Sequence, residues 1–353
     1  MGVSRGGRRP LRLLQVGMGD WGRDWGWRII PGVKSVKLVG CVDLNPKALA
    51  LARAEAGIPP ERCFTSLDEA FETTSPDAVL VTTLLPGHVP VARAALLAGK
   101  HVLVEKPFAR DLAGARKLVQ LAARRHLVLM VSQNYRFFPA VQVVARMVRR
   151  SALGELGQVW IDFRRYSPVR LKTPYAHHLD EQPLLVDMSI HHFDLLRYIL
   201  GEEARQVSCH VWNPRSSGFK GPPTATASII FDGGVVASYR GTWISPGSST
   251  PWGGQWRMDF EDGEIVWTSR GEDSGPAEAV VVQRRGQAPE IVAMPAMKRI
   301  DRWATLAEFA AAIRNGREPQ SSGRDNLGTL ALVHAAVDSA ALGKPVAVRA
   351  RRT

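Results

Sequence analysis

The sequence has few cysteines and no long apolar run, and both shortages limit what the protein can be. Cys41, Cys63 and Cys209 lie far apart in the sequence, with no CxxC pair and no histidine at metal-ligand spacing. They are expected to be small core residues in a reducing compartment. The strongest apolar run, residues 78–85, is interrupted by two threonines and is shorter than the roughly 18 residues of a membrane-spanning helix. We therefore expect no membrane segment.

Acidic residues are also scarce, since 33 Asp and Glu face 46 Lys and Arg and give a formal charge of +13. Clustered cations bind nucleic acids, but the arginines here are scattered along the chain in pairs and form no stripe. Nucleic acid is therefore not an expected partner. Arg8 and Arg9 precede an apolar segment and faintly resemble a twin-arginine export signal, yet residues 11–16 run straight into glycines. We interpret residues 11–16 as a strand and expect a cytoplasmic location.

The first third of the sequence alternates β-rich runs with segments of helical periodicity, which is typical of βαβ units around a parallel sheet. The expected strands are residues 11–16, 36–43, 78–83, 101–105 and 127–132. The expected helices between them are residues 46–56, 67–71, 88–98 and 112–125. This pattern predicts a doubly wound α/β domain over residues 8–134.

The remainder of the chain has the character of an antiparallel sheet with added helices. Strands are expected at residues 159–165, 206–212, 225–231, 235–243, 256–261, 264–267 and 279–284, and helices at 140–150, 184–200, 302–315 and 326–342. Asp-Gly pairs at residues 232–233 and 262–263 are typical of tight hairpins. The prediction is a second, α+β domain over residues 135–349 with a large open, mostly antiparallel sheet.

The segment VGMGDWG at residues 16–22 follows the first expected strand and carries three glycines with separate tasks. Gly17 permits a tight turn, Gly19 lets the backbone approach a pyrophosphate, and Gly22 allows close packing of a helix on the sheet. This spacing alone is a weak signal. Asp43, about 20 residues later at the end of the next expected strand, stands where a carboxylate accepts hydrogen bonds from an adenosine ribose. Together they predict a dinucleotide-binding Rossmann domain.

The residues expected to contact the dinucleotide begin with this loop: Gly17, Met18, Gly19, Asp20, Trp21 and Gly22. Asp43 would repel a 2′-phosphate and has no adjacent arginine, which favours NAD over NADP. The alternative for Asp43 is an ordinary aspartate in a surface turn. The Trp21 ring would form a wall of the cofactor site, whereas Trp25 and Trp27 are expected to pack on neighbouring elements.

Motifs along nearly the whole chain resemble those of the Gfo/Idh/MocA family, which is named after glucose-fructose oxidoreductase, inositol dehydrogenase and rhizopine catabolism. The motifs are VGMGDWG at 16–22, LPGHVPVARAALLAGKHVLVEKP at 85–107, SQNYRFFP at 132–139, VDMSIHHFD at 186–194 and SGRDNLGTLALVHAAVDSA at 322–340. The AGKHVLVEKP block followed by D-x-x-x-H is far more specific than the glycines. The resemblance implies a Rossmann domain, a second domain built on an open sheet, and a homodimer or homotetramer formed through that sheet.

The resemblance also implies three catalytic residues, Lys106, Asp187 and His191. Lys106 lies in Glu105-Lys106-Pro107, a loop that reaches the nicotinamide, and its ammonium would favour the developing alkoxide of the substrate. A cis peptide bond before Pro107 is one option for this turn. Asp187 and His191 are four residues apart, which places them on one helix face. Histidine suits proton transfer near neutral pH, so His191 is the expected general base in oxidation and Asp187 its partner.

Other implied contacts are less specific. Those expected beside the nicotinamide are Thr83, Leu84, Pro86, His88 and Asn134, with Gln133 as an alternative to Asn134. The sequence departs from the family pattern by the Leu84-Leu85 pair before Pro86, which leaves the register of individual contacts open. Arg136 is either a contact or a structural residue. The substrate candidates are Arg164, Tyr166 and His178, with His177 and Asp180 nearby.

A metal ion is the alternative use of several of these donors. Asp187, His191 and Asp194, with the histidines at 177 and 178 nearby in sequence, have suitable ligand atoms. Neither HExxH nor CxxC occurs, and hydride transfer to a nicotinamide needs no metal, so none is expected. His192 points about 100° away from this helix face and is expected in the core. Asp194 either supports the site or caps a neighbouring loop.

The expected function is that of an NAD-dependent oxidoreductase. It would transfer a hydride between a secondary alcohol of a sugar, cyclitol or related polyol and the nicotinamide; the fold does not choose among these substrates. Two alternatives are an NAD-dependent glycoside hydrolase that uses transient oxidation and reduction, and a non-catalytic NAD-binding regulator. The intact set of Lys106, Asp187 and His191 argues against the regulator, which needs no proton relay.

Overall fold

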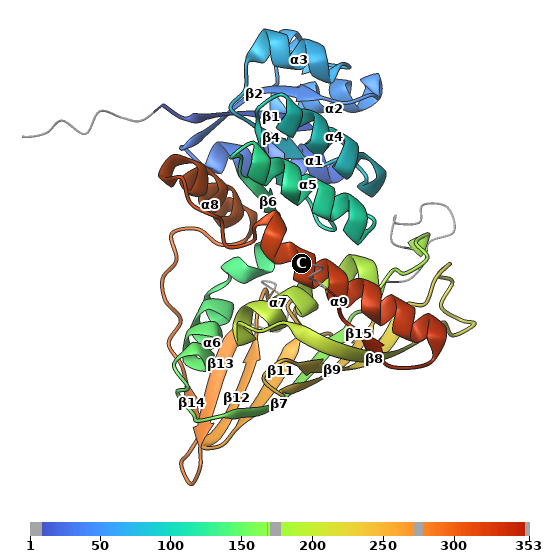
Figure 1. The fold of residues 1–353 in the computed structure, drawn as a ribbon, viewed down its shortest axis with the longest axis vertical. Helices are drawn as coiled ribbons and strands as arrows, with labels where there is room; N and C mark the ends of the chain where they lie inside the picture. Colours follow the sequence, from blue (N-terminus) through green and yellow to red (C-terminus); the bar gives the residue numbers. More distant parts are fainter. Residues whose placement is uncertain (1–8, 168, 170–177, 272–277, 350–353) are drawn as a thin grey trace, which may run out of the picture. The chain divides into compact units, whose positions relative to one another are not determined.

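A computed structural model describes residues 9–167, 169, 178–271 and 278–349 and divides the chain into two compact units (Figure 1). The first unit comprises Met1–Ser132 and Arg302–Asp325, and the second comprises Gln133–Asp301 and Asn326–Thr353. Residues 302–325 thus return to the first unit, although the sequence analysis assigned them to the second domain. Val131 and Ser321 exchange hydrogen bonds of 2.8 and 2.7 Å there, a long-range pairing that local sequence patterns do not report.

The first unit contains a six-stranded parallel sheet in the order β3-β2-β1-β4-β5-β6. Its strands are β1 (Leu11–Val16), β2 (Val36–Val42), β3 (Cys63–Phe64), β4 (Ala78–Val81), β5 (His101–Val104) and β6 (Leu129–Val131). This order is that of the doubly wound dinucleotide-binding fold, whose ligands bind beyond the carboxyl ends of the strands. All the predicted strands are present, and the two-residue β3 was not predicted because it is too short to show an alternating pattern.

Helices follow these strands within the first unit (Figure 1). They are α1 (Asp20–Asp24), α2 (Pro46–Ala56), α3 (Leu67–Thr74), α4 (Leu85–Leu97), α5 (Leu112–Arg124) and most of α8 (Asp301–Asn315). Asn45, Ser66 and Asp111 cap α2, α3 and α5 with their side chains, as such residues do at helix starts. Helix α4 begins three residues before its predicted start because Pro86 is tolerated in a first turn, where its missing N–H costs nothing.

The second unit is built on a nine-stranded sheet in the order β14-β13-β12-β11-β7-β10-β9-β8-β15. Its strands are β7 (Leu156–Arg164), β8 (Ala204–Trp212), β9 (Thr224–Phe231), β10 (Val236–Thr242), β11 (Gln255–Phe260), β12 (Gly263–Thr268), β13 (Ala279–Arg284), β14 (Glu290–Ile291) and β15 (Val346–Ala347). The two Asp-Gly hairpins join β9 to β10 and β11 to β12. One pair, β7 and β10, is parallel, so the sheet is mixed but mostly antiparallel.

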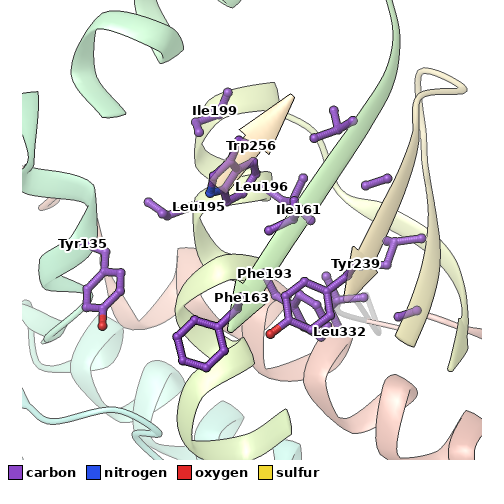
Figure 2. Packing of buried hydrophobic residues seen from close by; sticks show 14 of the residues in the cluster. Tyr135, Ile161, Phe163, Phe193, Leu195, Leu196, Ile199, Tyr239, Trp256 and Leu332 are labelled. Carbon is purple, nitrogen blue, oxygen red and sulfur yellow. The ribbon is translucent and has the colours of Figure 1, made fainter. Parts of the chain in front are cut away.

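The core of the second unit lies between one face of this sheet and the helices α6 (Pro139–Arg149), α7 (Ile190–Leu200) and α9 (Gly323–Leu342). Strand β7 illustrates how one face of the sheet becomes buried, because its successive side chains alternate between the two faces. Ile161 and Phe163 are buried in the core, whereas Asp162 lies on the open face. Figure 2 shows Phe163 gathered with Phe193 of α7 and other core residues. The predicted Asp-x-x-x-His segment, which ends in α7, therefore lies on the helix-covered side of the sheet.

The three cysteines are free thiols, and two of them lie side by side. Cys41 and Cys63 are register partners in β2 and β3, with their Sγ atoms 3.6 Å apart. Burial raises the pKa of the Cys41 thiol, and it raises that of Cys209 to about 12. Cys41 and Cys209 are buried, as predicted, whereas Cys63 is half-buried.

Candidate active site

The glycines of the first loop occupy three different environments. Gly17 has φ +99°, and a Cβ there would stand 2.5 Å from Thr83 N. A Cβ on Gly22 would stand 2.1 Å from Gly17 O, so this glycine allows the close packing of α1 on the loop. A Cβ on Gly19 would meet nothing within 4 Å. The first and third glycines are thus required by the protein itself, and the second leaves open space at the carboxyl end of β1, where a dinucleotide is expected.

Two buried polar side chains hold this loop, and the sequence analysis missed both. Gln15 Nε2 donates to Gly22 O at 2.6 Å and to Thr82 Oγ1 at 3.1 Å, and Thr82 Oγ1 donates to Gly17 O at 2.7 Å. Both side chains are buried. A glutamine inside the otherwise apolar run LRLLQV was the available signal, since a buried amide needs a partner.

Asp43 follows β2 and is hydrogen-bonded to the glycine loop. Its Oδ2 accepts from Met18 N–H at 2.6 Å, and its Oδ1 accepts from Asn45 N–H at 2.8 Å. Each carboxylate oxygen can accept a second hydrogen bond. Asp43 is therefore a turn aspartate that also joins the loop to the start of α2, and it retains acceptor positions for ribose hydroxyls.

The tryptophans of the motif differ sharply in exposure. Trp21 is 47% exposed, and the buried Arg302 guanidinium lies 4.0 Å from its ring centre and pairs with Asp24. Trp25 is fully buried, as expected of a packing residue, whereas Trp27 is 49% exposed. The side chain of Asp20 is almost fully exposed and pairs with Arg23 at 2.8 Å. Trp21 is thus held from one side by a cation and still presents surface to solvent.

The Glu105-Lys106-Pro107 loop is anchored on both sides of Lys106. Trp25 Nε1 donates to Glu105 Oε1 at 2.8 Å in the interior. His88 Nδ1 lies 2.8 Å from Pro107 O, and His88 Nε2 lies 2.9 Å from Thr83 O. The peptide bond between Lys106 and Pro107 is cis, which is the option that the sequence left open for this turn. These contacts fix the backbone from which Lys106 projects.

His88 is therefore a positioning residue in the structure. Burial lowers its pKa, although both carbonyl groups and the Glu105 charge act in the opposite direction. The other residues of this predicted cofactor loop are more open. Leu84 is 80% exposed, Pro86 is exposed, and Thr83 donates its hydroxyl to Leu84 O. Leu84 and Pro86 thus face solvent, whereas His88 is buried and holds the backbone at Thr83 and Pro107.

In the second unit, the expected catalytic pair lies where a π-helical turn becomes an α-helix. Residues Leu185–Ser189 form the π turn, in which Ser189 N–H donates to Leu184 O at 2.8 Å, and α7 follows from Ile190. Asp187 lies in the π turn and His191 in α7, so the pair spans the junction of the two helix types. The ring of His191 stacks on that of Tyr135, with 4.0 Å between centroids and an interplanar angle of 3°.

A buried ion pair holds the segments that carry this stack. Arg136 Nε and Nη2 donate to the two oxygens of Asp194, each at 2.6 Å. Asn326 and Thr329 of α9 also donate to Asp194, at 3.2 and 2.9 Å. Arg136 and Asp194 are both 1% exposed. Arg136 is thus a buried ion-pair residue, and Asp194 is its partner and also joins α7 to α9.

His192 is a core residue, as predicted. Its Nδ1 lies 3.2 Å from the Tyr239 hydroxyl and its Nε2 lies 3.1 Å from Trp252 O, while Ser189 donates to Tyr239 at 2.9 Å. Burial lowers the pKa of His192 to about 4. The neutral ring fits this chain of hydrogen bonds, with Nε2–H donating to the carbonyl and Nδ1 accepting from the phenol.

The proposed substrate residues lie in different places. Arg164 is exposed on the open face of the sheet, where it lines a hollow with Trp160, and Tyr166 is 57% exposed. His178 is buried, with its Nε2 2.9 Å from the Ser167 hydroxyl. By the strand alternation, Arg165 and not Arg164 shares the side of Phe163 and the helices. His177 lies outside the described residues.

Asn134 and Gln133 also differ in their bonding. The Asn134 amide donates to Asp301, whereas neither amide atom of the buried Gln133 has a hydrogen-bond partner among the described residues. Gln133 thus has the free amide of the two. Among the residues that the structure describes, no group of three or more His, Cys, Asp or Glu side chains is arranged to hold a metal ion. No helix of the described residues is long and apolar enough to cross a membrane.

Two family models match this chain, one over the parallel sheet and one over much of the mixed sheet. Residues 11–133 match the oxidoreductase family with an NAD-binding Rossmann fold, and residues 141–266 match the GFO/IDH/MocA C-terminal domain. A D-apiose dehydrogenase of Paraburkholderia graminis is 29% identical, over 95% of this chain and 88% of the relative. An inositol 2-dehydrogenase of Rhizobium meliloti is 26% identical, over 91% and 94% of the two chains.

Solved structures show the same fold. An oxidoreductase of Agrobacterium radiobacter, in complex with NAD+, L-tartaric acid and magnesium, gives a TM-score of 0.85 at 23% identity over 96% of this chain and 98% of the other. An inositol dehydrogenase homologue of Azotobacter vinelandii, complexed with NADH and myo-inositol, gives 0.80 at 20% identity over 96% and 98%. With its glycine loop, its two sheets and both family models in agreement, the protein belongs to the Gfo/Idh/MocA family of NAD-dependent oxidoreductases.

Proposed function

We propose that the enzyme oxidises a secondary alcohol of a sugar, cyclitol or related polyol, or reduces the corresponding ketone. The observation that carries this proposal is the anchoring of the Lys106 backbone by Trp25 through Glu105 and by His88 through Pro107. A surface lysine has no need of two buried anchors. Relatives that act as D-apiose dehydrogenase and inositol 2-dehydrogenase support a polyhydroxylated substrate.

The first unit fits a dinucleotide. The open space at Gly19 admits a pyrophosphate, and Asp43 retains acceptors for ribose hydroxyls, which favours NAD over NADP. The contacts that we assign to the cofactor are the loop residues 17–22, Asp43, Thr83, Leu84, Pro86, Glu105, Lys106 and Asn134 or Gln133. His88 would act by holding Thr83 and Pro107 in place. When bound, NAD supplies the nicotinamide that accepts or returns the hydride.

The remaining chemistry is assigned to side chains of the chain itself. Lys106 donates a hydrogen bond to the carbinol oxygen and stabilises the alkoxide as it develops. His191 accepts the proton in oxidation and returns it in reduction, and Asp187 orients the imidazole. Tyr135 holds the ring plane of His191 through the stacked contact. Lys106 thus acts on the charge of the oxygen and His191 on its proton.

The test compares Lys106→Ala and His191→Ala with Lys37→Ala, which alters an exposed lysine on β2. NADH formation is followed by absorbance over a panel of sugars and inositols, with NADP run in parallel, and NADH binding is measured by fluorescence. Both site variants should bind NADH normally and lose about 10² to 10⁴-fold in turnover, the usual contribution of a proton-transfer group. Full activity in either variant would contradict the assignment. Sugar release from a glycoside without net NADH would instead show the hydrolase alternative.

We also propose that the open face of the nine-stranded sheet packs against a second copy of the chain. This face carries charges of both signs, in the pairs Arg240–Asp162 and Arg257–Asp259. The same face of a second copy would therefore offer each of these charges an opposite one. Trp160 lies among them beneath the Arg257 guanidinium, at 5.6 Å. Light scattering of the wild type and of Trp160→Asp should show a dimer or tetramer that the variant weakens. A wild-type monomer at micromolar concentration would rule this interface out.

A further inference from the structure

Two arginines and a tryptophan form a cluster beside the ring that stacks on His191. The Arg165 guanidinium lies 4.1 Å from the centre of the Trp252 ring. The Arg270 guanidinium lies 5.7 Å from the same ring and 4.4 Å from the ring of Tyr135. Tyr135 in turn stacks on His191. Two cations are therefore linked by aromatic contacts to the expected proton-transfer residue, all within the second unit.

Backbone hydrogen bonds fix the segments that carry this cluster. Trp252 N–H donates to Arg270 O at 3.2 Å, and Trp252 O lies 3.1 Å from His192 Nε2. Arg165 N–H donates to Thr242 O at 3.0 Å, and Arg165 O accepts from Ser245 N–H at 3.0 Å. The two guanidinium groups are thus presented from a backbone that is already held in place, which lowers the entropy cost of binding a ligand.

Arg270 has the less usual environment of the two. Its φ of +53° lies in the left-handed region, which residues other than glycine seldom adopt and which is concentrated at functional sites. Its guanidinium donates to the Tyr135 hydroxyl, and no carboxylate among the described residues pairs with it. A half-buried cation is therefore held by two aromatic side chains, Tyr135 and Trp252, and neither of them neutralises its charge.

We propose that Arg270, with the Arg165 cation beside it on Trp252, binds a negatively charged group of the substrate, so that the enzyme prefers a polyhydroxylated acid to the matching neutral sugar. This inference rests on the function proposed above. The Arg270 guanidinium packs on aromatic rings and donates one hydrogen bond to a phenol, and its remaining N–H groups can form charge-assisted hydrogen bonds to an oxyanion. A carboxylate and a phosphate share this chemistry, and Arg is suited to both.

The pleat of β7 explains why the sequence analysis missed this pair. Arg164 and Arg165 are neighbours at the end of the strand, but successive side chains point to opposite faces. Arg164 lines a hollow on the open face, whereas Arg165 packs on Trp252. Arg270 is 105 residues from Arg165 in sequence and follows β12, so no local motif joins the two.

The experiment uses the full-length enzyme with NAD and matched substrates: D-glucose, D-glucuronate and D-glucose 6-phosphate, and D-galactose, D-galacturonate and D-galactonate. Wild type is compared with Arg270→Gln, Arg165→Gln and the control Arg205→Gln, which alters an exposed arginine on β8. The acids should give the higher kcat/KM in the wild type. The two site variants should lose about 10- to 100-fold on acids and less than about 3-fold on neutral sugars, since a charge-assisted bond serves only the anion.

The two sources of the anion are separated by the panel. A preference for glucuronate or galactonate would show that the bound anion is a carboxylate, and a preference for glucose 6-phosphate would show that it is a phosphate. Raising the salt concentration should weaken the preference in either case, because salt screens the charges. Equal losses on acids and neutral sugars would mean that the arginines are structural, and that result would overturn the proposal. Arg270→Lys gives a second check, because it keeps the charge but loses the paired hydrogen bonds.

Failure of this inference is distinguishable from failure of the proposed function. Oxidation of neutral sugars in preference to acids would overturn the anion proposal and leave the oxidoreductase assignment intact. If no compound in the panel turns over, calorimetry with D-glucuronate and D-glucose 6-phosphate in the presence of NADH decides. Binding to the wild type that Arg270→Gln abolishes supports the anion site, and absence of binding to the wild type overturns it.

Discussion

The candidate sites of the two units are built in different ways. In the first unit the backbone dominates, because Gly17 and Gly22 shape a loop, Gly19 leaves it open, and carbonyl groups hold His88. In the second unit side chains dominate, through the Tyr135 and His191 stack and the ion pair beneath it. A backbone site depends on a few glycines with fixed conformations, whereas a side-chain site depends on a buried polar network. The two should therefore fail in different ways.

The backbone site should be most sensitive at Gly22. Gly22→Ala places a Cβ 2.1 Å from Gly17 O, a backbone atom with no room to move, so we expect complete loss of NADH binding. Gly19→Ala meets no protein atom and should leave the melting temperature unchanged while weakening NADH binding about 10-fold, as one extra methyl group in a tight site does. Calorimetric melting and NADH fluorescence check both. Equal effects of the two alanines would contradict this division of tasks.

The side-chain site should be most sensitive at its ion pair. Arg136→Met leaves the buried Asp194 carboxylate without its cation, and the free energy of unfolding should fall by about 3 to 5 kcal/mol. Arg317→Met removes an equally bidentate pair with Glu308 at the surface, where we expect a loss of about 0 to 1 kcal/mol. Urea unfolding of the two variants gives the comparison. A loss at Arg136 as small as that at Arg317 would show that burial does not set the cost.

Acid should weaken the second unit through His192. Its pKa of about 4 in the folded protein lies below its ordinary value, so the unfolded chain takes up the proton first as the pH falls. The stability that depends on the neutral ring is complete above about pH 6.5 and is lost progressively down to about pH 4, by about 3 kcal/mol. His192→Asn should remove this slope from a series of unfolding curves, whereas His210→Gln, on an exposed residue of β8, should not. In the first unit, the lowered pKa of His88 adds a loss in the same direction.

The smallest effect is expected at Tyr135. Tyr135→Leu removes the ring that stacks on His191, and kcat/KM should fall about 2- to 10-fold, in line with the value of an aromatic pair. Tyr135→Phe keeps the stack and should stay closer to wild type on neutral substrates. The informative measurement is the pH profile of kcat/KM, which a purely structural change would scale without moving. An unshifted profile in Tyr135→Leu would assign the ring to packing alone.

Much of the fold was predictable because local signals and long-range packing agree. The alternating runs predicted every strand except the two-residue β3, β14 and β15, and the capping residues Asn45, Ser66 and Asp111 stand at helix starts. The glycine loop and Glu105-Lys106-Pro107 were predictable from their motifs, because each requires particular residues in consecutive positions. The return of residues 302–325 to the first unit was not, since its hydrogen bonds join Val131 to Ser321 across 190 residues.

The contacts that hold the candidate site in place were not predictable from the sequence. Trp25 is 80 residues from Glu105, and Arg136 is 58 residues from Asp194, so no motif links either pair. Arg302 lies far along the chain from Trp21, yet its guanidinium packs on that ring. Each of these contacts buries a polar group whose partner is identified only by the three-dimensional arrangement.

The sequence by itself determined the order of the two sheets, the family, and the loop in which Lys106 lies, because these depend on periodicity and on short motifs. The tertiary structure decided which side chains support that loop and which arginine at the end of β7 shares a side with His191. The physical reason is the same in both cases. Hydrogen bonds, stacking and ion pairs act over a few ångströms in space, and chain distances of 56 to 281 residues carry no trace of that proximity.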